Sequence, residues 1–397
     1  MIRITASLAR YLMRAYRLKF SIPYKIHQKQ KKDLSDCEDF KFEQFKLNVL
    51  RYIEERQIED KSPRYLYSAS SNKPTLYASA YACMTRGMLG SIDGLPFSLK
   101  QEWCKYFDSF QNKEDGLFCD PVIENEIYAE SDWWGSRHLA LHMISAYTAL
   151  GEKPKHPFHF LSKYYSADAI SNWLNLYNWS SAEIGREDPD NKIMNIGCLL
   201  QYQRDTWNDR EAGAAVQHLK DSLRKKLNKE TGMWGGFDIS NPHERSRMVQ
   251  FAYHLFPIFF YDKEFDFDAE KIVGITLSTQ NRFGGFGVQP NSSACEDIDS
   301  IDLLIRLYPF MSGQLQAAIN DSLAKAFNWV LLNQVDDGGF IFRLNEAFRY
   351  GSDNTSSLPN EGAMLPTWFR TLSLAYMARF LGLANNFVIT RCPGYEF

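Results

Sequence analysis

Hydrophobic positions recur every three or four residues along most of this chain, which is the spacing that places them on one face of an α-helix. Strand-like alternation is scarce from Asp39 onward. The helical segments come in pairs, in which the first helix runs into a turn and the second leaves it. Six pairs are predicted: 40–55 with 75–89, 99–111 with 132–150, 160–177 with 190–203, 209–228 with 243–260, 268–280 with the helix that opens near 296, and 315–334 with 366–381.

The two helices of a pair differ in composition. The second helices are rich in small and apolar residues, as in the run 76–82, whereas the first helices carry more charge, as in 220–226. This difference is expected if one helix of each pair is buried inside a ring and the other lies outside. The pattern predicts an all-α (α/α)6 toroid formed by residues 40–397 as one domain, preceded by a basic arm and linker at 1–39. The first turns of the inner helices would then surround one mouth of the ring.

Composition narrows the function. Hydrophobic residues make up 45% and aromatic residues 15% of the 397 residues, which is ample for a large core, and the net charge of -3 argues against a nucleic-acid partner. Seven scattered cysteines without a CxxC pair are typical of reduced thiols in a cytoplasmic protein. No apolar run reaches the roughly 18 residues of a membrane span. Motifs for nucleotide-binding loops, nucleophile elbows and zincins are lacking, so no cofactor is predicted.

The first 32 residues carry nine Lys or Arg and no acid. Apolar and basic residues alternate there at helical spacing: Ile4, Leu8, Leu12 and Tyr16, with Arg3, Arg10, Arg14 and Arg17 between them. A basic amphipathic helix of this kind can lie on an anionic membrane surface, which predicts a cytoplasmic protein with a peripheral membrane contact. The alternative is a helix packed onto the main domain, or a disordered arm.

One stretch, 278–304, carries the densest chemistry. A helix ends at Gln280-Asn281, a glycine turn follows at 283–287, and the next helix opens with four acids within seven residues: Glu296, Asp297, Asp299 and Asp302. Acids suit the first turn of a helix because the N-terminal end of its dipole is positive. Four exceed what capping requires. Clustered carboxylates cannot all ionise cheaply, so one of them is expected to keep a proton for acid catalysis.

The turns of this chain resemble the QW repeat of squalene and terpene cyclases, in which a helix ends in Gln and a Gly-Gly-Phe turn leads to an inner helix. The best matches are Gln280 with 284–286 and Gln334 with 337–340, and Gln111 with 115–118 is looser. The resemblance implies a terpenoid cyclase-like toroid, a fold that the protein prenyltransferase β subunit also uses. It covers most of 40–382 as architecture, while only the turns match as motifs.

Class II terpene cyclases of this family carry a DxDD motif at the start of an inner helix, and its middle Asp protonates the substrate. In this chain Asp297 matches the first Asp and Asp299 the proton donor, while Ser300 stands at the last Asp. The resemblance thus implies acid-initiated cyclisation of a polyprenyl substrate, with Asp299, Asp297 and Glu296 as candidate catalytic residues. The prenyltransferase zinc pattern needs a cysteine where Asp299 stands, so no metal site is predicted.

Other residues near the predicted starts of inner helices are candidates for substrate binding. Aromatic rings can stabilise a carbocation or stack on a sugar, and arginines can bind a carboxylate, a phosphate or a sugar acid. For these residues the alternatives are core packing and ion pairs with neighbouring acids. His138 and His142 share a helical face, but without a third ligand they are expected to be hydrogen-bonded histidines. The candidates are Trp133, Trp134, Asp132, Arg137, His138, Arg245 and Trp368.

Three functions remain open from the sequence. The first is a class II terpene cyclase-like enzyme acting on a hydrophobic isoprenoid. The second is a carbohydrate-active (α/α)6 enzyme, a glycosidase or a lyase, because paired carboxylates and stacking aromatic residues would look the same. The third is a non-catalytic toroid that binds a glycan or a lipid. An apolar aromatic cavity would favour the first, an open polar groove the second, and a mouth filled by side chains the third.

Overall fold

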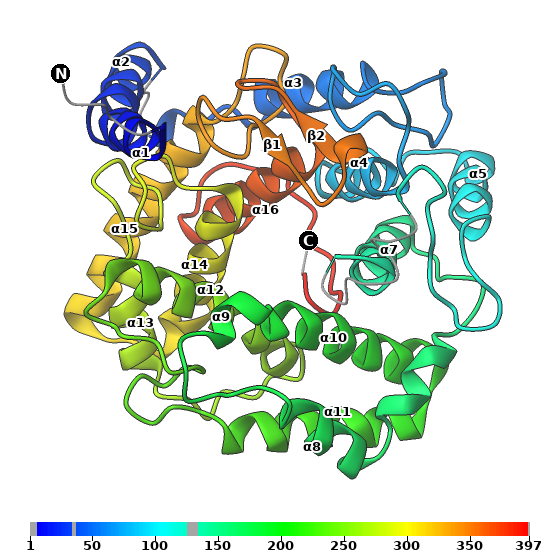
Figure 1. The fold of residues 1–397 in the computed structure, drawn as a ribbon. Helices are drawn as coiled ribbons and strands as arrows, with labels where there is room; N and C mark the ends of the chain where they lie inside the picture. Colours follow the sequence, from blue (N-terminus) through cyan, green and yellow to red (C-terminus); the bar gives the residue numbers. More distant parts are fainter. Residues whose placement is uncertain (1–5, 34–36, 125–133, 396–397) are drawn as a thin grey trace.

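A computed structural model describes residues 6–33, 37–124 and 134–395, and these fold into a ring of helices (Figure 1). Within the described chain the inner helices are α4 (Leu76–Met88), α7 (Ser136–Leu150), α10 (Pro189–Trp207), α12 (Pro242–Tyr261), α14 (Ala294–Leu307) and α16 (Met364–Phe380). Each packs on the next, and α16 returns to α4, which closes the ring. The predicted all-α (α/α)6 toroid is confirmed.

The outer helices lie around this ring: α3 (Phe42–Glu54), α5 (Phe97–Asp108), α8 (Ala167–Leu174), α11 (Arg210–Lys225), α13 (Ala269–Leu277) and α15 (Gly313–Leu332). Short helical turns connect them, namely α9 (Ile184–Glu187), η2 (Cys37–Asp39), η3 (His159–Tyr164), η4 (Tyr308–Phe310) and η5 (Asp353–Thr355). The strands of the described chain are two-residue segments, β1 (Phe348–Arg349) and β2 (Ser356–Ser357), paired antiparallel with Phe348 opposite Ser357.

Burial separates the two rings of helices as their composition predicts. Residues 364–378 of α16 are buried without exception, because this helix has neighbours on every side. In α11 the buried residues fall at helical spacing and the remaining face is charged. Helices that are apolar all round belong in a core, and amphipathic helices cover it.

The glutamines of the QW-like turns bind backbone carbonyl groups. The Gln280 side-chain amide donates to the carbonyl oxygens of Gly284, in its own turn, and Ser322, in the next outer helix, both at 2.8 Å. Gly284 has a φ of +100°, and a Cβ there would lie 2.5 Å from the Lys325 carbonyl oxygen. The turn therefore requires glycine for both its backbone angle and its close approach to α15. This explains the recurring motif as a device that joins consecutive helix pairs.

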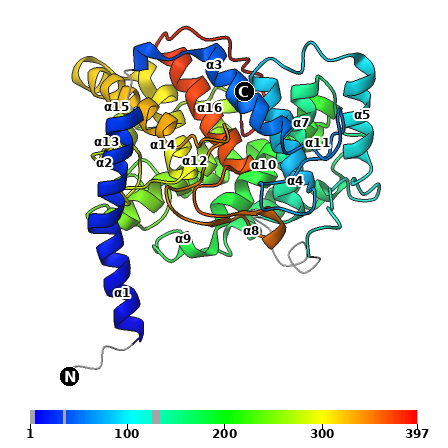
Figure 2. The ribbon, with the colours of Figure 1, turned by 90° about the horizontal axis from the view of Figure 1, so that it is seen from above.

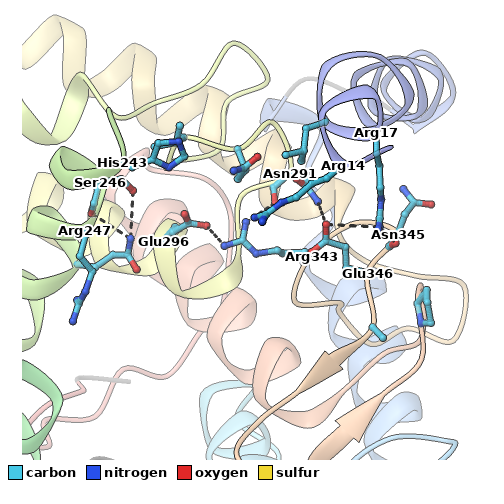
Figure 3. Close-up of a pocket in the computed structure, with 16 residues that line it drawn as sticks. Arg14, Arg17, His243, Ser246, Arg247, Asn291, Glu296, Arg343, Asn345 and Glu346 are labelled. Atoms are coloured by element: carbon cyan, nitrogen blue, oxygen red, sulfur yellow. Dashed lines mark hydrogen bonds and ion pairs between the residues drawn. The ribbon is translucent and has the colours of Figure 1, made fainter. Parts of the chain in front are cut away.

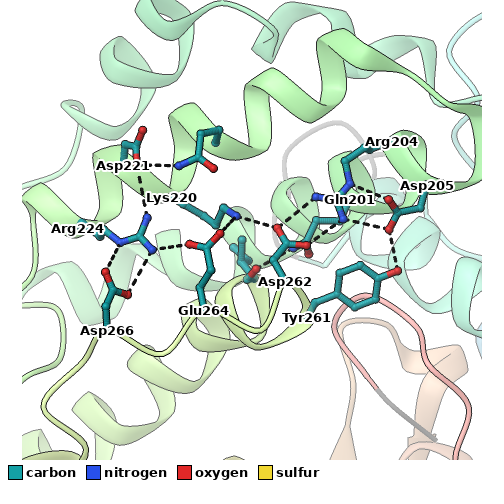
Figure 4. A network of polar contacts seen from close by, with 12 residues as sticks. Gln201, Arg204, Asp205, Lys220, Asp221, Arg224, Tyr261, Asp262, Glu264 and Asp266 are labelled. Atoms are coloured by element: carbon teal, nitrogen blue, oxygen red, sulfur yellow. Dashed lines mark hydrogen bonds and ion pairs between the residues drawn. The ribbon is translucent and has the colours of Figure 1, made fainter.

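A network of buried and half-buried ion pairs joins α10, α11 and the end of α12 (Figure 4). Lys220 of α11 is buried, and its Nζ lies 2.8 Å from Asp262 and 2.5 Å from Glu264. Asp262 also pairs with Arg204 at 2.9 Å, and Glu264 also pairs with Arg224. Neither carboxylate would be left without a cation if Lys220 were replaced.

We expect Lys220→Met to lower the free energy of unfolding by about 1–3 kcal/mol, since two charge-assisted hydrogen bonds are lost while both carboxylates keep an arginine. Urea denaturation followed by circular dichroism measures this loss. Lys225→Met, on the exposed face of the same helix, is the matched control and should change stability by less than about 0.5 kcal/mol. Equal stability of the two variants would contradict the prediction.

The C-terminal segment lies at the centre of the ring (Figure 1). The Val388 N–H donates to the Met88 carbonyl oxygen at 2.8 Å, and Arg391 donates to the Tyr261 carbonyl oxygen. Farther along, the Tyr395 ring centre lies 4.9 Å from that of Trp368. Both rings are buried, so this segment fills the middle of the ring with side chains.

The basic arm is helical and nearly continuous: α1 (Ala6–Tyr16), the π-helix η1 (Arg17–Ser21) and α2 (Ile22–Asp33). Ile22 and Ile26, one turn apart, are buried where α2 packs against α15. Residues 28–33, predicted as part of a linker, form the end of α2 instead. Figure 2 shows α1 projecting beyond the body of the ring. No helix in the described chain is long and apolar enough to cross a membrane.

Candidate functional site

A cavity of about 860 Å³ lies at the mouth of the ring, beside the first turns of α12 and α14. Two loops and the N-terminal helix complete its wall (Figure 3). Its lining is rich in charged and amide side chains: Arg14, Arg17, Leu18, His243, Ser246, Arg247, Gln250, Val288, Gln289, Asn291, Glu296, Arg343, Asn345, Glu346, Ala347 and Pro359.

Cations outnumber anions in this lining, since four arginines face two glutamates. Arg343 pairs with Glu296 at 2.7 Å, and Arg17 lies 3.7 Å from Glu346. Arg14 is exposed and has no ion pair among the described residues. A cavity with this balance of charge attracts an anionic group such as a carboxylate or a phosphate.

Glu296 stands at the rim of the cavity and also begins a helix. Its carboxylate accepts from the Ser293 backbone N–H at 2.8 Å, and Ser293 Oγ accepts from the Glu296 N–H at 3.2 Å, which together form a capping box. The predicted capping role is therefore present. Arg343, which also lines the cavity, donates a hydrogen bond to the same carboxylate at 2.7 Å.

Asp297 points away from the cavity into the wall of the ring. It accepts hydrogen bonds from the Phe286 N–H, Ser292 Oγ and Trp329 Nε1, each at 2.9 Å. A fully buried ion pair with Arg370 at 2.8 Å completes its surroundings. A carboxylate with four donors has no lone pair free for a substrate proton. These contacts suit an anchor between the QW-like turn, α14, α15 and α16 rather than the catalytic role that the resemblance implies.

Asp299 lies one helical turn below Glu296, on the same side of α14. Its side chain is only 2% exposed, and its Oδ2 has no hydrogen-bond partner in the described part of the chain. Burial raises the pKa of Asp299 well above its usual range. Arg247 lowers this pKa, and the negative charges of Glu296, Asp190 and Asp297 raise it further. A buried carboxyl of this kind keeps its proton where ordinary aspartates lose theirs.

Arg247 connects the cavity with a second buried acid. It lines the cavity, and its guanidinium binds both oxygens of Asp190 at 2.9 Å. His254 Nδ1 lies 2.8 Å from the same carboxylate. Although burial opposes ionisation, Arg247 and His254 hold the pKa of Asp190 below its usual range. Asp190 and Asp299 both interact with the charge of Arg247, and their pKa values are pushed in opposite directions, a pattern typical of acid–base sites.

Three of the residues predicted to bind substrate belong instead to an aromatic cluster between α4, α7 and α16. Trp134 stacks on Tyr77 with ring centres 4.8 Å apart, and Trp368 stacks on Tyr81 at 5.3 Å. His138 Nδ1 lies 2.9 Å from the Tyr77 hydroxyl. All are buried and none of them lines the cavity, which agrees with the core-packing alternative.

The histidine pair has hydrogen-bonded surroundings. His138 and His142 lie with their Nε2 atoms 3.1 Å apart, and the Tyr350 hydroxyl lies 2.9 Å from His138 Nε2. Burial lowers the pKa of His138 to about 3, so both rings stay neutral across the physiological range. Among the described residues no group of three or more His, Cys, Asp or Glu is placed to hold a metal ion. All seven cysteines are free thiols.

The remaining predicted residues lie apart from the cavity or outside the described chain. The Arg137 guanidinium lies 5.8 Å from the centre of the Phe160 ring, and Arg245 donates to the Ile239 carbonyl oxygen at 3.1 Å. Asp132 and Trp133 lie outside the described residues. The arginine of α12 that lines the cavity is Arg247, two positions after Arg245, because residues two apart lie on nearly opposite faces of a helix.

Sequence reasoning missed Arg343 as a site residue. It lies in the loop after the Gly338-Gly339-Phe340 turn, where no helical period indicates the direction of a side chain. An arginine three residues after a QW-like turn was the available signal. Arg14 and Arg17 were predicted as part of a membrane-facing helix, and the structure places both in the cavity wall.

No protein-family model matches the chain, and no curated protein matches it. Solved structures do match. The unsaturated glucuronyl hydrolase of Bacillus sp. GL1, responsible for degradation of glycosaminoglycan, has a TM-score of 0.49 at 12% identity, over 89% of this chain and 99% of that one. The GH76 α-mannanase of Bacteroides thetaiotaomicron has a TM-score of 0.43 at 11% identity, over 86% of this chain and 96% of that one.

The ent-copalyl diphosphate synthase of Streptomyces platensis has a TM-score of 0.40 at 12% identity. It is aligned over 77% of this chain, which spans half the length of that one. At these identities the similarity concerns the fold alone. The chain shares with these proteins the ring of paired helices.

Proposed function

We propose that this chain is a carbohydrate-active hydrolase that cleaves an anionic glycan at the mouth of the toroid. The observation that carries the proposal is the position of Asp299, a buried carboxyl whose pKa is raised by burial and which lies one turn below a cavity rich in arginine. A glycosidic oxygen needs such a proton, because an alkoxide is a poor leaving group.

The lining of the cavity favours a sugar over a polyprenyl chain. Of its sixteen residues, Leu18, Val288, Ala347 and Pro359 are apolar, and none is a phenylalanine, tyrosine or tryptophan. A carbocation formed there would meet water and carboxylates rather than the faces of such rings. The arginines and amides instead match the hydroxyl and carboxylate or phosphate groups of an acidic sugar.

In the proposed reaction the Asp299 proton passes to the glycosidic oxygen as the bond from that oxygen to the anomeric carbon breaks. Water adds hydroxide to the anomeric carbon, and the remaining proton of the water goes to the two carboxyl groups, Asp299 and Glu296. The pair then again holds the one proton that it gave away. Glu296, held by Arg343 at the rim, is the second carboxylate of the pair. Arg343 and Arg247 hold the anionic group of the sugar so that the bond to be cleaved lies above Asp299.

Acid-initiated cyclisation of a polyprenyl chain is the second candidate, and the same buried proton favours it. Asp299 stands where the resemblance to class II terpene cyclases places the proton donor. The neighbouring buried Tyr253 and Tyr395 interact with its charge, and they are the kind of ring that a carbocation needs. This reaction would require the substrate to reach the aromatic centre of the ring, where the C-terminal segment now lies.

The test measures turnover of three substrate classes by the purified full chain. These are oligosaccharides that contain a uronic acid, their neutral counterparts with the carboxylate reduced to an alcohol, and a polyprenyl diphosphate. We expect new reducing ends from the acidic oligosaccharides, with kcat/KM at least about tenfold above that for the neutral ones. Arg343→Gln should remove most of this preference, because one good charge-assisted contact is worth about 1.5–3 kcal/mol.

Equal turnover of acidic and neutral oligosaccharides would refute the anionic substrate. Cyclisation of the diphosphate without hydrolysis of any glycan would replace the proposal by its alternative. Arg349→Gln, which removes an exposed arginine outside the cavity lining, is the matched control and should leave the preference unchanged.

A further inference from the structure

We propose that α1 docks on an anionic lipid bilayer and thereby brings the cavity to glycans carried by membrane lipids. The docking itself is independent of the reaction, while the choice of a lipid-borne substrate rests on the proposed function. The two parts are separated in the experiment below.

An apolar surface that no described part of the ring covers runs along α1 and η1. Its large side chains are exposed although they are apolar: Tyr11 is 69% exposed, Leu12 49%, Met13 69% and Tyr16 61%. Phe20 of η1 continues the same surface. A contiguous set of exposed apolar side chains on one helix indicates an interaction surface, whereas scattered ones do not.

Cations occupy the opposite side of the same helix. Arg10 and Arg14 of α1 and Arg17, the first residue of η1, are spaced four and three residues apart, so they share a face. Leu12 lies about 200° around the axis from both Arg10 and Arg14. The described residues of α1 include no acid. A helix with one apolar face and one basic face fits the boundary between anionic head groups and acyl chains.

The ring fixes the position of this helix. Ile22 and Ile26 of α2 are buried, Lys25 donates to the Asn345 side chain at 3.4 Å, and Arg17 donates to the Asn345 carbonyl oxygen. These contacts hold the C-terminal half of the arm, while α1 projects beyond the ring (Figure 2). The projecting half therefore reaches a flat surface before the rest of the molecule meets it.

The positive charge of α1 favours an anionic bilayer over a second copy of the chain as its partner. Two copies packed through α1 would bring the cations of both helices together, and like charges at an interface are unfavourable. An anionic bilayer instead offers an opposite charge, worth about 1 kcal/mol for each Lys or Arg near the surface. Arg10, Arg14 and Lys19 are exposed and able to contribute.

The same helix forms part of the cavity wall. Arg14, Arg17 and Leu18 line the cavity, and Figure 3 shows Arg17 extending from the helix toward Asn345 and Glu346. Docking through Leu12 and Tyr16 would place Arg14 at the height of the lipid head groups, with the cavity beside it. A glycan attached to an anionic lipid would then have its sugar next to the cavity and its charge next to these arginines.

Vesicle sedimentation tests the docking. The full chain is mixed with vesicles of pure phosphatidylglycerol or pure phosphatidylcholine, at low and at high salt. We expect sedimentation with phosphatidylglycerol at low salt and little with phosphatidylcholine. The double variant Leu12→Glu/Tyr16→Glu should bind at least about tenfold more weakly, because both changes place a carboxylate on the apolar face. Leu176→Glu, at an exposed leucine elsewhere, is the matched control and should bind as the wild type does.

Equal binding to the two lipids, or binding that the double variant retains, would overturn the docking. So would a wild-type dimer in sedimentation velocity that the double variant converts to a monomer without any vesicle binding, because a second copy would then be the occupant.

Activity separates the substrate inference from the proposed function. Leu12 and Tyr16 do not line the cavity, so hydrolysis of a soluble acidic oligosaccharide should be the same in the double variant and the wild type. Hydrolysis of the same oligosaccharide on a vesicle-borne lipid should fall at least about tenfold in the double variant. Equal rates on the vesicles would refute the lipid-borne substrate alone. Failure of both substrates with docking intact would refute the proposed hydrolase, and the lipid-borne substrate with it, while the docking would stand.

Discussion

Arg370→Met is expected to lower the free energy of unfolding by about 3–5 kcal/mol, the usual cost of removing one partner from a buried ion pair. Arg370 is fully buried, and its guanidinium binds Asp297 at 2.8 Å and the carbonyl oxygens of Ile341 and Phe342 at 2.9 and 3.0 Å. Methionine fills similar space but donates nothing. The Asp297 charge would stay buried, supported by neutral donors alone.

Urea denaturation followed by circular dichroism measures this change. Arg379→Met, at an exposed position near the end of the same helix, is the control and should cost less than about 0.5 kcal/mol. The double variant Arg370→Met/Asp297→Asn should recover part of the loss, because it removes the uncompensated charge. If Arg370→Met were as stable as the control, the ion pair would not be the anchor that its geometry indicates.

Asp299→Asn is expected to lower turnover by about 10²–10⁴-fold while leaving the ring folded. Asparagine matches the shape of the aspartate but has no carboxyl proton to give. Turnover of the acidic oligosaccharide that the wild type cleaves measures the loss, and circular dichroism verifies the fold. Wild-type turnover by this variant would show that the proton comes from elsewhere.

The same variant has a second signature that does not depend on the substrate. Burial raises the pKa of Asp299 in the folded chain above its ordinary value of 3.8, so above this pH the folded state holds a proton that the unfolded state has lost. Ionisation therefore makes wild-type stability fall as the pH rises from about 4 toward the folded-state pKa. The asparagine side chain of the variant does not titrate. Relative to the wild type, the variant should gain stability with rising pH, by up to about 1.4 kcal/mol per pH unit.

Urea denaturation at pH 4, 5.5 and 7 gives this difference directly. Asp321→Asn, which removes an exposed aspartate that pairs with Lys325, is the matched control for the loss of one carboxylate. A difference between Asp299→Asn and the wild type that stayed flat with pH would mean that Asp299 ionises as an ordinary aspartate does. The acid role would then lose its physical basis, whatever the assay showed.

The sequence alone determined the architecture. Helical periodicity and glycine turns are local signals in the sequence. Periodicity indicates which face of a helix is buried, and the turns indicate where one helix ends and the next begins. The six pairs and their inner and outer members could therefore be predicted without coordinates. The capping of α14 by Ser293 and Glu296 is equally local, because its partners are three residues apart. The position of Asp299 on the same face as Glu296 follows from that spacing too.

Only the tertiary structure decided which charges meet. Asp297 is joined to Arg370, 73 residues away in the sequence, and Glu296 to Arg343, 47 residues away. These pairs exist because the ring closes and brings the starts of different helices to one mouth. Helical spacing gives the face of a side chain but not its depth, so Trp134 and Trp368 were indistinguishable from residues of a binding surface until the core was seen. For the same reason, the sequence could not show that Arg247 rather than Arg245 lines the cavity. A cavity wall is formed by contacts between several segments, and no single segment determines it.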